Sequence, residues 1–520
     1  MSRLKKFQRN LTASYIQLGA LVVYSLAAVP LVLRWLPKEE FGLWSLLIQI
    51  MGYVSLIDLG MTQATCRLLV DHKDSPEDGK YGSLLKTFGL VCLAQALLVV
   101  LAFFILAPVL AALLELPARY SEMFVSLIRL QCLVVGFNFL IRPLSQILVA
   151  NQRSDIMVYG EIFYLFASLA ILAILLSKGV GIFSYFYAGL IVPAVAPLWL
   201  FWNCRRLALF PGRGRWGQTS RQMFKEIFNY GKDVFLVTLG WQLIMTSQII
   251  VITRCLGLDM AAVWAVGIRF FTLIMQLVLR AFTVSMPTLA EMLARQESAR
   301  LKKRFKELVL LITGMAVVLA FSFVLCNSVF IKVWLSGRIL WPPVNDLLLA
   351  VWLIAIAMQT CHFNLIILRK EIAGLKYVLL AEGICFIAGA ILIGSRWGIA
   401  GILGVSIICT GLFSYQYCLR QSRQYFACAG FWEIAFEWLR PVFRLMFWLG
   451  LIAGICWPLT RMIDDLWLRL FANALTAGVA GGILFVRIGC PAAIVHELAG
   501  FLPAPAKKVL LAVVPNHHGG

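Results

Sequence analysis

The stretch that decides the fold runs from Arg34 to Arg67 and reads RWLPKEEFGLWSLLIQIMGYVSLIDLGMTQATCR. It predicts a short turn followed by a long apolar helix with one acid, Asp58, inside it. A second stretch, which begins at Arg254, reads RCLGLDMAAVWAVGIRFFTLIMQLVLRAFTVSMP. When Arg34 is aligned with Arg254, Trp44 falls on Trp264. The pattern indicates two copies of one membrane unit that face each other, with the function between them.

The composition settles the broad class of protein. Apolar residues make up 61% of the chain, charged residues 14%, and the mean hydropathy is +0.87. Soluble domains contain about 45–50% apolar and about 25% charged residues. Apolar runs of about 20 residues match the length of a membrane-spanning helix, and the runs lack the alternation of a membrane β-barrel. We therefore predict an all-α polytopic membrane protein.

The apolar runs predict fourteen spans, arranged as two pseudo-symmetric six-helix bundles and two extra helices. The lobes expected are 1–215, 216–430 and an addition at 431–520, which holds the extra helices and a cytoplasmic tail. The spans lie near 11–34, 41–66, 84–113, 123–150, 157–177, 181–203, 233–254, 261–290, 308–335, 346–368, 375–395, 398–419, 442–460 and 466–487.

The repeat extends past the opening stretch. In the same alignment Gly181 falls on Gly401 and Arg142 on His362, while Glu161 lies one residue from Glu382. Because each half has an even number of spans, the two copies run in the same direction through the membrane, an arrangement that some transporters use around a central site.

Charge sets the expected orientation. The formal net charge of +21 comes from 46 basic and 25 acidic residues. If the N-terminus is placed inside, the loops on that side carry most of the basic residues, as expected for cytoplasmic loops. Both termini are therefore predicted to be cytoplasmic, and the charge requires no nucleic-acid partner.

The largest inside loop, about 205–232, separates the halves and contains the GxGxxG pattern GRGRWG at 212–217. A dinucleotide site needs that pattern between a strand and a helix, whereas here it lies between two membrane spans. We interpret the loop as a flexible basic linker.

The sequence contains no pattern typical of a catalytic or metal site. The predicted outside loops are short, His496-Glu497 lacks the second His of a HExxH motif, and neither a Walker A motif nor a CxxC pair is present. We expect no enzymatic activity, no cofactor and no metal.

Four arginines inside spans are the candidates for substrate binding: Arg129, Arg142, Arg269 and Arg280. Each costs about 2.5–3.5 kcal/mol at a helix centre, so it should face protein or water. Arg269 and Arg280 are about three turns apart and share one helix face, roughly 16 Å apart. A cavity lined by guanidinium groups would bind phosphate. The alternative is that these side chains reach a headgroup layer or pair with acids.

Asp58, Glu161, His362 and Glu382 are the candidates for coupling to an ion gradient. A buried carboxylate can carry a proton or bind sodium, and a histidine titrates near neutral pH. For each acid the alternative is a structural pair or a helix cap, and for His362 it is a hydrogen-bonded packing role.

The segment LPKEEFGLWSL at 36–46, followed by DLGMTQA at 58–64 and by Arg67, resembles the N-terminal signature of polysaccharide (lipid-linked oligosaccharide) flippases. Their superfamily also contains multidrug and toxic-compound extruders and lipid II flippases. The motif supports Asp58, Gly60 and Arg67 only as positions that match the signature, and the four arginines are inferred from burial.

The resemblance implies two lobes around a central cationic cavity. It implies alternating-access transport of an undecaprenyl-pyrophosphate-linked oligosaccharide from the inner to the outer leaflet of the bacterial cytoplasmic membrane. It further implies coupling to a proton or sodium gradient or to the membrane potential. The expected partners are the anionic lipid-linked oligosaccharide, membrane lipids and a polysaccharide polymerase complex.

Four alternatives stay open. An extruder of cationic drugs needs carboxylates in its cavity, whereas the spans hold more arginine than acid. A lipid II-type flippase would handle a similar pyrophosphate lipid. A membrane-bound sugar transferase or ligase is opposed by the short outside loops, and the last alternative is a scaffold without transport of its own.

Overall fold

The computed structural model describes residues 3–72, 79–212, 214–369, 371, 373–428, 430 and 432–491, and within them the chain is helical, without strands. It divides into two compact units, Met1–Ala262 and Val263–Gly520. The predicted cytoplasmic tail lies beyond the described residues. The all-α prediction is confirmed.

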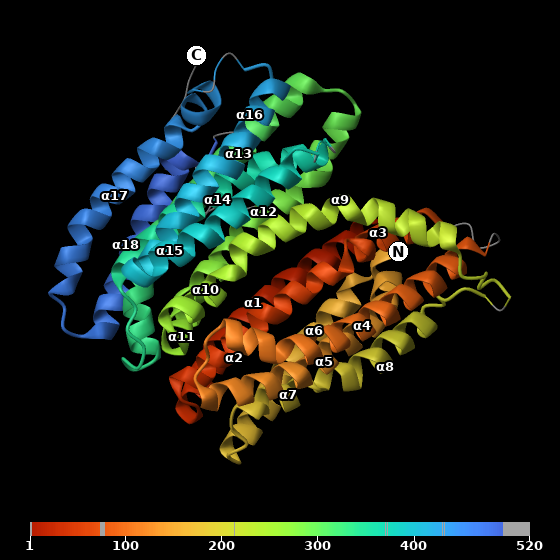
Figure 1. Cartoon of the computed structure of the whole chain (residues 1–520). Coiled ribbons are helices and arrows are strands. Elements are labelled where there is room, and N and C mark those ends of the chain that lie inside the picture. Colours follow the sequence, from red (N-terminus) through yellow and green to blue (C-terminus); the bar gives the residue numbers. More distant parts are fainter. Residues whose placement is uncertain are drawn as a thin grey trace. The chain divides into compact units, whose positions relative to one another are not determined.

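The first unit is built from long helices joined by short breaks (Figure 1). Its elements are α1 (Arg3–Trp35), α2 (Lys38–Gly52), the 3-10 helix η1 (Tyr53–Asp58), α3 (Met61–His72), α4 (Lys80–Leu113), α5 (Ala118–Ala150), α6 (Ser154–Ser177), η3 (Gly181–Phe183), α7 (Ser184–Gly189), α8 (Ile191–Arg206), α9 (Arg221–Met245) and α10 (Ser247–Leu256). Helix α11 (Leu258–Gly267) crosses the boundary between the units.

The second unit contains three short π-helices among its long helices. Its elements are α12 (Arg269–Ala294), α13 (Ser298–Trp334), α14 (Pro343–Leu368), α15 (Leu375–Thr410), the π-helix η4 (Gly411–Tyr415), α16 (Gln416–Tyr425), the π-helix η5 (Glu433–Glu437), α17 (Arg440–Arg461), α18 (Leu466–Leu484) and the π-helix η6 (Phe485–Gly489).

Within the described residues, twelve helical segments are long and apolar enough to cross a membrane, or thirteen if a bent pair is one span. The predicted fourteen is not reached by this count. One segment, Leu375–Tyr425, has 51 residues, or about 76 Å of helix, more than twice the hydrocarbon thickness of about 30 Å. It is interrupted at Gly398 (φ 61°, ψ −149°), between the predicted spans 375–395 and 398–419.

Two predicted continuous helices are broken, which corrects the prediction. The helix expected at 41–66 changes at Gly52 to a 3-10 turn and stops at Leu59 and Gly60, whose φ angles are 49° and 72°. The helix expected at 261–290 bends by 41° between α11 and α12. A hydropathy average along the sequence cannot locate such breaks, because the residues on both sides of them are equally apolar.

The two copies of the internal repeat begin a helix at the same aligned position. The alignment that places Trp44 on Trp264 also places Lys38, the first residue of α2, on Leu258, the first residue of α11. The predicted match of Gly181 with Gly401 is three residues away from the structural one. Gly181 has φ 70° at the turn after α6, whereas in the second half the glycine with a positive φ at the corresponding turn is Gly398 and not Gly401.

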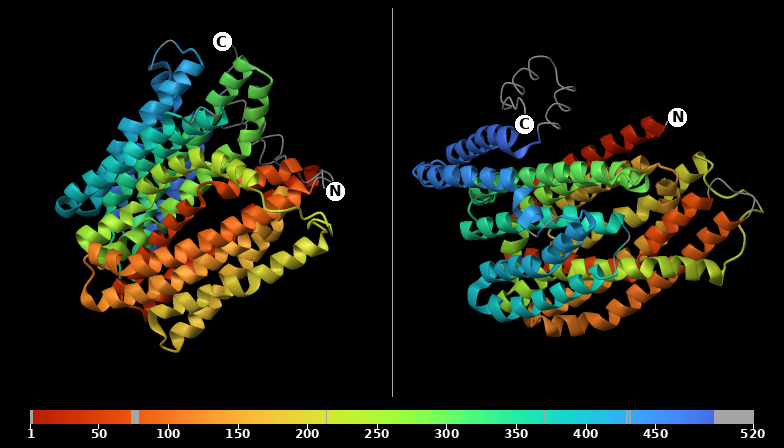
Figure 2. Two further views of the ribbon diagram at one scale, coloured as in Figure 1. Left: turned by 45° about the vertical axis from the view of Figure 1, so that its right-hand side comes forward. Right: turned by 90° about the horizontal axis from the view of Figure 1, so that it is seen from above.

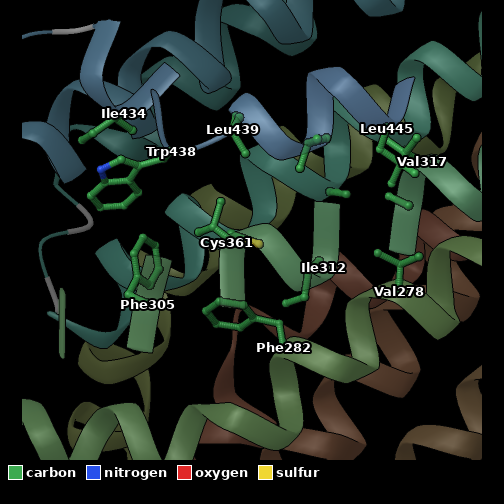
Figure 3. Close-up of a cluster of buried hydrophobic side chains, with 14 of the residues drawn as sticks. Val278, Phe282, Phe305, Ile312, Val317, Cys361, Ile434, Trp438, Leu439 and Leu445 are labelled. Carbon is green, nitrogen blue, oxygen red and sulfur yellow. The ribbon is translucent and has the colours of Figure 1, made fainter. Parts of the chain in front are cut away.

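Each unit has its own core. In the first unit α4, α5 and α8 lie side by side and bury Phe88, Leu148 and Leu200 between them (Figure 1). In the second unit α17 and α18 lie against α13 (Figure 2). Figure 3 shows Phe305 and Ile312 of α13 pointing into a cluster with Trp438. Since lipid is as apolar as these side chains, tight packing holds such helices together.

The connection before α9 is ordered where the structure describes it, which corrects the prediction of a flexible linker. The Nζ of Lys86 donates to the carbonyl of Gly217 at 2.9 Å, and the backbone N–H of Ser220 donates to Thr87 Oγ1 at 3.2 Å. A Cβ at Gly82 would lie 2.5 Å from the Cα of Trp216. The connection is therefore packed on the first turns of α4.

The bend between α11 and α12 gives a stability prediction. A Cβ at Gly267 would lie 2.1 Å from the ring of Trp341, which is 3% exposed and donates to Asp346 at 2.6 Å. Overpacking of a fixed core costs about 1–3 kcal/mol. We expect Gly267→Ala to lower the melting temperature of the detergent-solubilised protein.

Gly404→Ala is the matched control, because no atom lies within 4 Å of the added carbon and alanine is the better helix former. It should leave the melting temperature equal or slightly higher. Equal melting temperatures for the two variants would show that the ring of Trp341 does not confine this position.

Candidate substrate-binding site

The break in the opening stretch positions its acid. Leu59 adopts a left-handed conformation, which costs an L-residue roughly 1–2 kcal/mol and must be held by its surroundings. The Nε2 of Gln95 on α4 donates to the carbonyl of Ile57 at 2.9 Å. This bond satisfies a backbone group at the break and fixes the 3-10 turn that ends at Asp58.

Asp58 forms an ion pair with Arg142 of α5. The Nη1 of Arg142 lies 2.7 Å from Asp58 Oδ1, and the two side chains are 26% and 14% exposed, respectively. Thr62 donates both its backbone N–H, at 3.2 Å, and its hydroxyl to the same carboxylate. The guanidinium lies 3.8 Å from the ring centroid of Phe139. The pair therefore joins the broken helix to α5 in a charged, largely covered cluster.

Arg142 thus has the acidic partner that the alternative interpretation required. Its Nη1 is within 3.4 Å of Thr62 Oγ1 as well. About a quarter of the Arg142 side chain stays exposed. An anion that reached its guanidinium would compete with Asp58 for the same charge.

Arg129 lies elsewhere on α5. Its Nη2 donates to the carbonyl of Phe104 on α4 at 3.5 Å, and its guanidinium lies 5.8 Å from the ring of Phe104. Thirteen residues separate Arg129 from Arg142, which at about 100° per residue places them roughly 140° apart around the helix. The two arginines of α5 therefore do not share a face.

The broken region of α2 is fastened to the segment that carries the second copy. The hydroxyl of Tyr53 lies 2.6 Å from Ser247 Oγ and 3.3 Å from the carbonyl of Gln242, where α9 gives way to α10. Near the other end of α2, a Cβ at Gly42 would lie 2.2 Å from the carbonyl oxygen of Leu258. Within the first unit, α2 is thus packed against the first residue of α11.

Arg269 and Arg280 lie in the second unit. Helix α12 is continuous across both residues, as their predicted common face requires. Arg269 is its first residue and directly follows the bend. Both side chains are half-buried and interact with other groups of the chain. This places one basic group at the bend and a second about three turns along the same helix.

Glu161 and Glu382 have different surroundings. Glu161 of α6 is exposed and accepts a hydrogen bond from the side-chain amide of Gln17 on α1. Glu382 of α15 is 1% exposed and accepts the backbone N–H of Ser414 at 3.2 Å. Ser414 lies in a π-helical turn, a local widening that is frequent at functional sites. Of the predicted coupling residues in the second unit, Glu382 is the buried acid.

His362 packs in the core of the second unit. It is 1% exposed, its Nδ1 lies 2.9 Å from Ser422 Oγ, and its ring meets the ring of Phe305 edge to face at 5.5 Å. This geometry is that of a hydrogen-bonded packing residue.

The sequence analysis missed Asp346, the first acid of α14. It is fully buried and accepts hydrogen bonds from Trp341 Nε1 at 2.6 Å, from Asn327 Nδ2 at 2.7 Å and from the hydroxyl of Ser328. Asn327 also donates to the carbonyl of Gly267 at 3.3 Å. Asp346 therefore anchors the bend before Arg269. An acid in the first turn of an otherwise apolar helix was the signal available.

No group of three or more His, Cys, Asp or Glu in the described part of the chain is placed to hold a metal ion. The candidate functional groups are the ion pair Asp58–Arg142 in the first unit and the basic residues and buried acids of the second.

Comparison with solved structures identifies the fold. A multidrug resistance MATE family transporter of the MOP superfamily, solved in an inward-facing conformation, superposes with a TM-score of 0.63 at 12% identity over 79% of this chain and 96% of its own. The lipid II flippase MurJ, in an inward closed conformation, superposes with a TM-score of 0.63 at 13% identity, over 92% of this chain and 98% of its own. The MATE multidrug transporter DinF-BH superposes with a TM-score of 0.61 at 12% identity, over 82% of this chain and 97% of its own.

At the level of sequence, no curated protein gives a significant match. A family model does: the one described as "Polysaccharide biosynthesis protein" matches residues 12–293, which is more than half of the chain and includes the opening stretch and α12 up to Leu293. The chain belongs to this polysaccharide biosynthesis protein family, and it has the multi-pass membrane fold of the MOP superfamily transporters.

Proposed function

We propose that this protein is a flippase that moves a polyprenyl-pyrophosphate-linked oligosaccharide from the inner to the outer leaflet of the bacterial cytoplasmic membrane. The observation that carries the proposal is the pair of half-buried arginines, Arg269 and Arg280, on one face of α12. They belong to a chain of the polysaccharide biosynthesis protein family.

The chemistry of such a substrate explains why arginine is needed. The pyrophosphate and sugars cannot cross hydrocarbon unaided, whereas the lipid tail can stay in the bilayer. Guanidinium groups bind phosphate oxygens through two parallel hydrogen bonds and remain charged at every physiological pH. Two of them on one helix face offer successive positions for a diphosphate during alternating access.

The ion pair of the first unit has a second role in this proposal. The substrate anion competes with Asp58 for the guanidinium of Arg142. Because Asp58 ends the 3-10 turn, loss of the pair removes one of the contacts that hold the break at Leu59 and Gly60, beside those made by Thr62 and Gln95. Substrate binding is thereby linked to a change in the shape of the opening stretch.

Glu382 is the residue that we propose for coupling to a proton or sodium gradient. It is buried, and no Lys, Arg or His of the described residues forms an ion pair with it. A carboxylate without a basic partner in the membrane interior is costly unless it binds a cation. Glu161 is exposed, and Asp58 already has a cationic partner, which makes both less suited to this role.

The remaining parts of the proposal concern the cellular setting. Both termini lie in the cytoplasm, the chain transports without catalysis, and a polysaccharide polymerase complex receives the product. The basic loops on the side of the N-terminus support this orientation.

Extrusion of cationic drugs is the second candidate, because solved MATE transporters share the fold. The charges inside the helices oppose it, since a cation would meet guanidinium groups. The two functions can be distinguished by measuring transport of a pyrophosphate lipid, expected for the flippase, beside transport of a cationic dye, expected for the drug extruder.

The first prediction concerns α12. In a host that lacks its own copy of the gene, Arg269→Ala or Arg280→Ala should abolish surface glycan while the protein still inserts, and Arg→Lys should retain part of the export. Arg300→Ala is the control, because Arg300 is exposed and paired with Glu297 at 3.0 Å. Normal glycan at normal protein level in both α12 variants would remove the central claim.

The second prediction concerns the ion pair. Breaking a buried pair from one side leaves an uncompensated charge that costs about 3–5 kcal/mol, and partial exposure here reduces that to roughly 1–3 kcal/mol. Asp58→Asn and Arg142→Gln should each lower the melting temperature, and the double variant should be less destabilised than the sum. Additive effects in this double-mutant cycle would show that the two side chains are not coupled.

The third prediction concerns coupling. In proteoliposomes, Glu382→Gln should make the transport rate independent of an imposed proton or sodium gradient, because the neutral amide cannot take up a proton and lacks the negative charge that holds a sodium ion. Glu161→Gln is the matched control and should keep the gradient dependence. An unchanged gradient dependence in Glu382→Gln assigns this residue to structure.

A further inference from the structure

Helix α17 has two chemically different faces. Val442, Leu445 and Leu449 are each at most 2% exposed and pack into the core of the second unit. Figure 3 shows Leu439, just before the helix, and Leu445 on the side of that core. The opposite face carries Phe447 and Trp448, which are 63% and 48% exposed. The helix is thus anchored on one side and presents aromatic rings on the other.

The exposed face forms a pocket with the π-helical turn η5. Its volume is about 680 Å³, and its lining combines aromatic rings with charges from Phe436, Glu437, Arg440, Phe443, Arg444, Phe447 and Trp448. The rings of Phe436 and Phe443 stack at 5.3 Å with an interplanar angle of 18°. A volume of this size is in the range of small-ligand sites.

The charges of this pocket are not balanced. Arg440 and Arg444 are one helical turn apart, and neither forms a hydrogen bond or ion pair with another described residue through its side chain. Like charges at this spacing repel by a few tenths of a kcal/mol. Glu437 contributes one negative charge to the lining, so the pocket as a whole is positive.

Two other exposed arginines of this unit have acidic partners. Arg295 pairs with Glu291 at 2.5 Å and Arg300 with Glu297 at 3.0 Å. The uncompensated pair on α17 therefore suits an anion that comes from outside the chain.

The position of the pair along the helix identifies that anion. Helix α17 is a candidate membrane span of 22 residues, about 33 Å long, which matches the hydrocarbon thickness of about 30 Å. Arg440 and Arg444 lie in its first turns. If α17 spans the bilayer, these turns reach the depth of the lipid phosphates, and Phe447 and Trp448 follow where aromatic rings border the acyl chains.

We propose that this pocket binds an anionic membrane phospholipid. The guanidinium groups of Arg440 and Arg444 donate to the phosphate oxygens, and the rings of Phe443, Phe447 and Trp448 contact the upper acyl chains. The positive charge of the pocket favours a lipid with net negative charge over a zwitterionic one. Lipid binding at this pocket does not depend on the identity of the proposed transport substrate.

The test uses the full-length protein in detergent micelles that contain phosphatidylcholine. Binding is followed as quenching of Trp448 by phosphatidylglycerol with brominated acyl chains. The signal of Trp448 is the difference between the unmodified protein and Trp448→Phe. Since each basic residue contributes about 1 kcal/mol to the attraction of anionic lipid, the double variant Arg440→Gln/Arg444→Gln should need about 30-fold more phosphatidylglycerol for half-saturation.

The control is Arg295→Gln/Arg300→Gln, which removes two positive charges that already have acidic partners. This variant should reach half-saturation at the same amount of phosphatidylglycerol as the unmodified protein. Brominated phosphatidylcholine on the unmodified protein should quench Trp448 weakly, and this comparison needs no variant. Equal quenching by the two lipids, or an unchanged titration of the α17 double variant, would overturn the proposal. Displacement of the lipid by millimolar inorganic phosphate would assign the pocket to a free anion and would also overturn it.

Discussion

The ion pair between Asp58 and Arg142 is the interaction on which the first unit depends. A charge inside a membrane helix is costly unless a partner or water surrounds it, and a broken helix exposes backbone groups that need partners as well. Both requirements are met at one place. The break at Leu59 and Gly60 allows Asp58 to reach Arg142 and Thr62, and Gln95 satisfies the carbonyl of Ile57. A polar cluster can therefore persist within an apolar bundle.

The corresponding place in the second copy is built differently. In the alignment of the two copies Asp58 falls on Val278, which is 1% exposed in the core of the second unit, and Gly60 falls on Arg280. The second unit has its bend earlier, at Gly267, where Asn327, Trp341 and Asp346 fasten it. The two copies thus share the order of their helices but carry their charged residues at different positions. The first copy holds the ion pair of Asp58 with Arg142, and the second carries Arg269 and Arg280 on α12.

Much of this could be predicted from the sequence, because membrane helices require long apolar runs and leave basic residues in the loops. The signature around Asp58 indicated the family. Features set by distant contacts could not be predicted. The partner of Asp58 lies on another helix at Arg142, the connection before α9 is held by Lys86 and Thr87, and Asp346 is buried by donors from α13 and from Trp341. Hydropathy also cannot locate a break such as Gly398, since the residues around it are apolar on both sides.

Transport by the purified protein in proteoliposomes tests the proposed flippase activity directly. One preparation contains a polyprenyl-pyrophosphate-linked oligosaccharide, and the leaflet that holds the glycan is read with a membrane-impermeant glycosidase. A parallel preparation offers a cationic dye. We expect protein-dependent translocation of the lipid-linked glycan and no accumulation of the dye. Accumulation of the dye without movement of the glycan would contradict it.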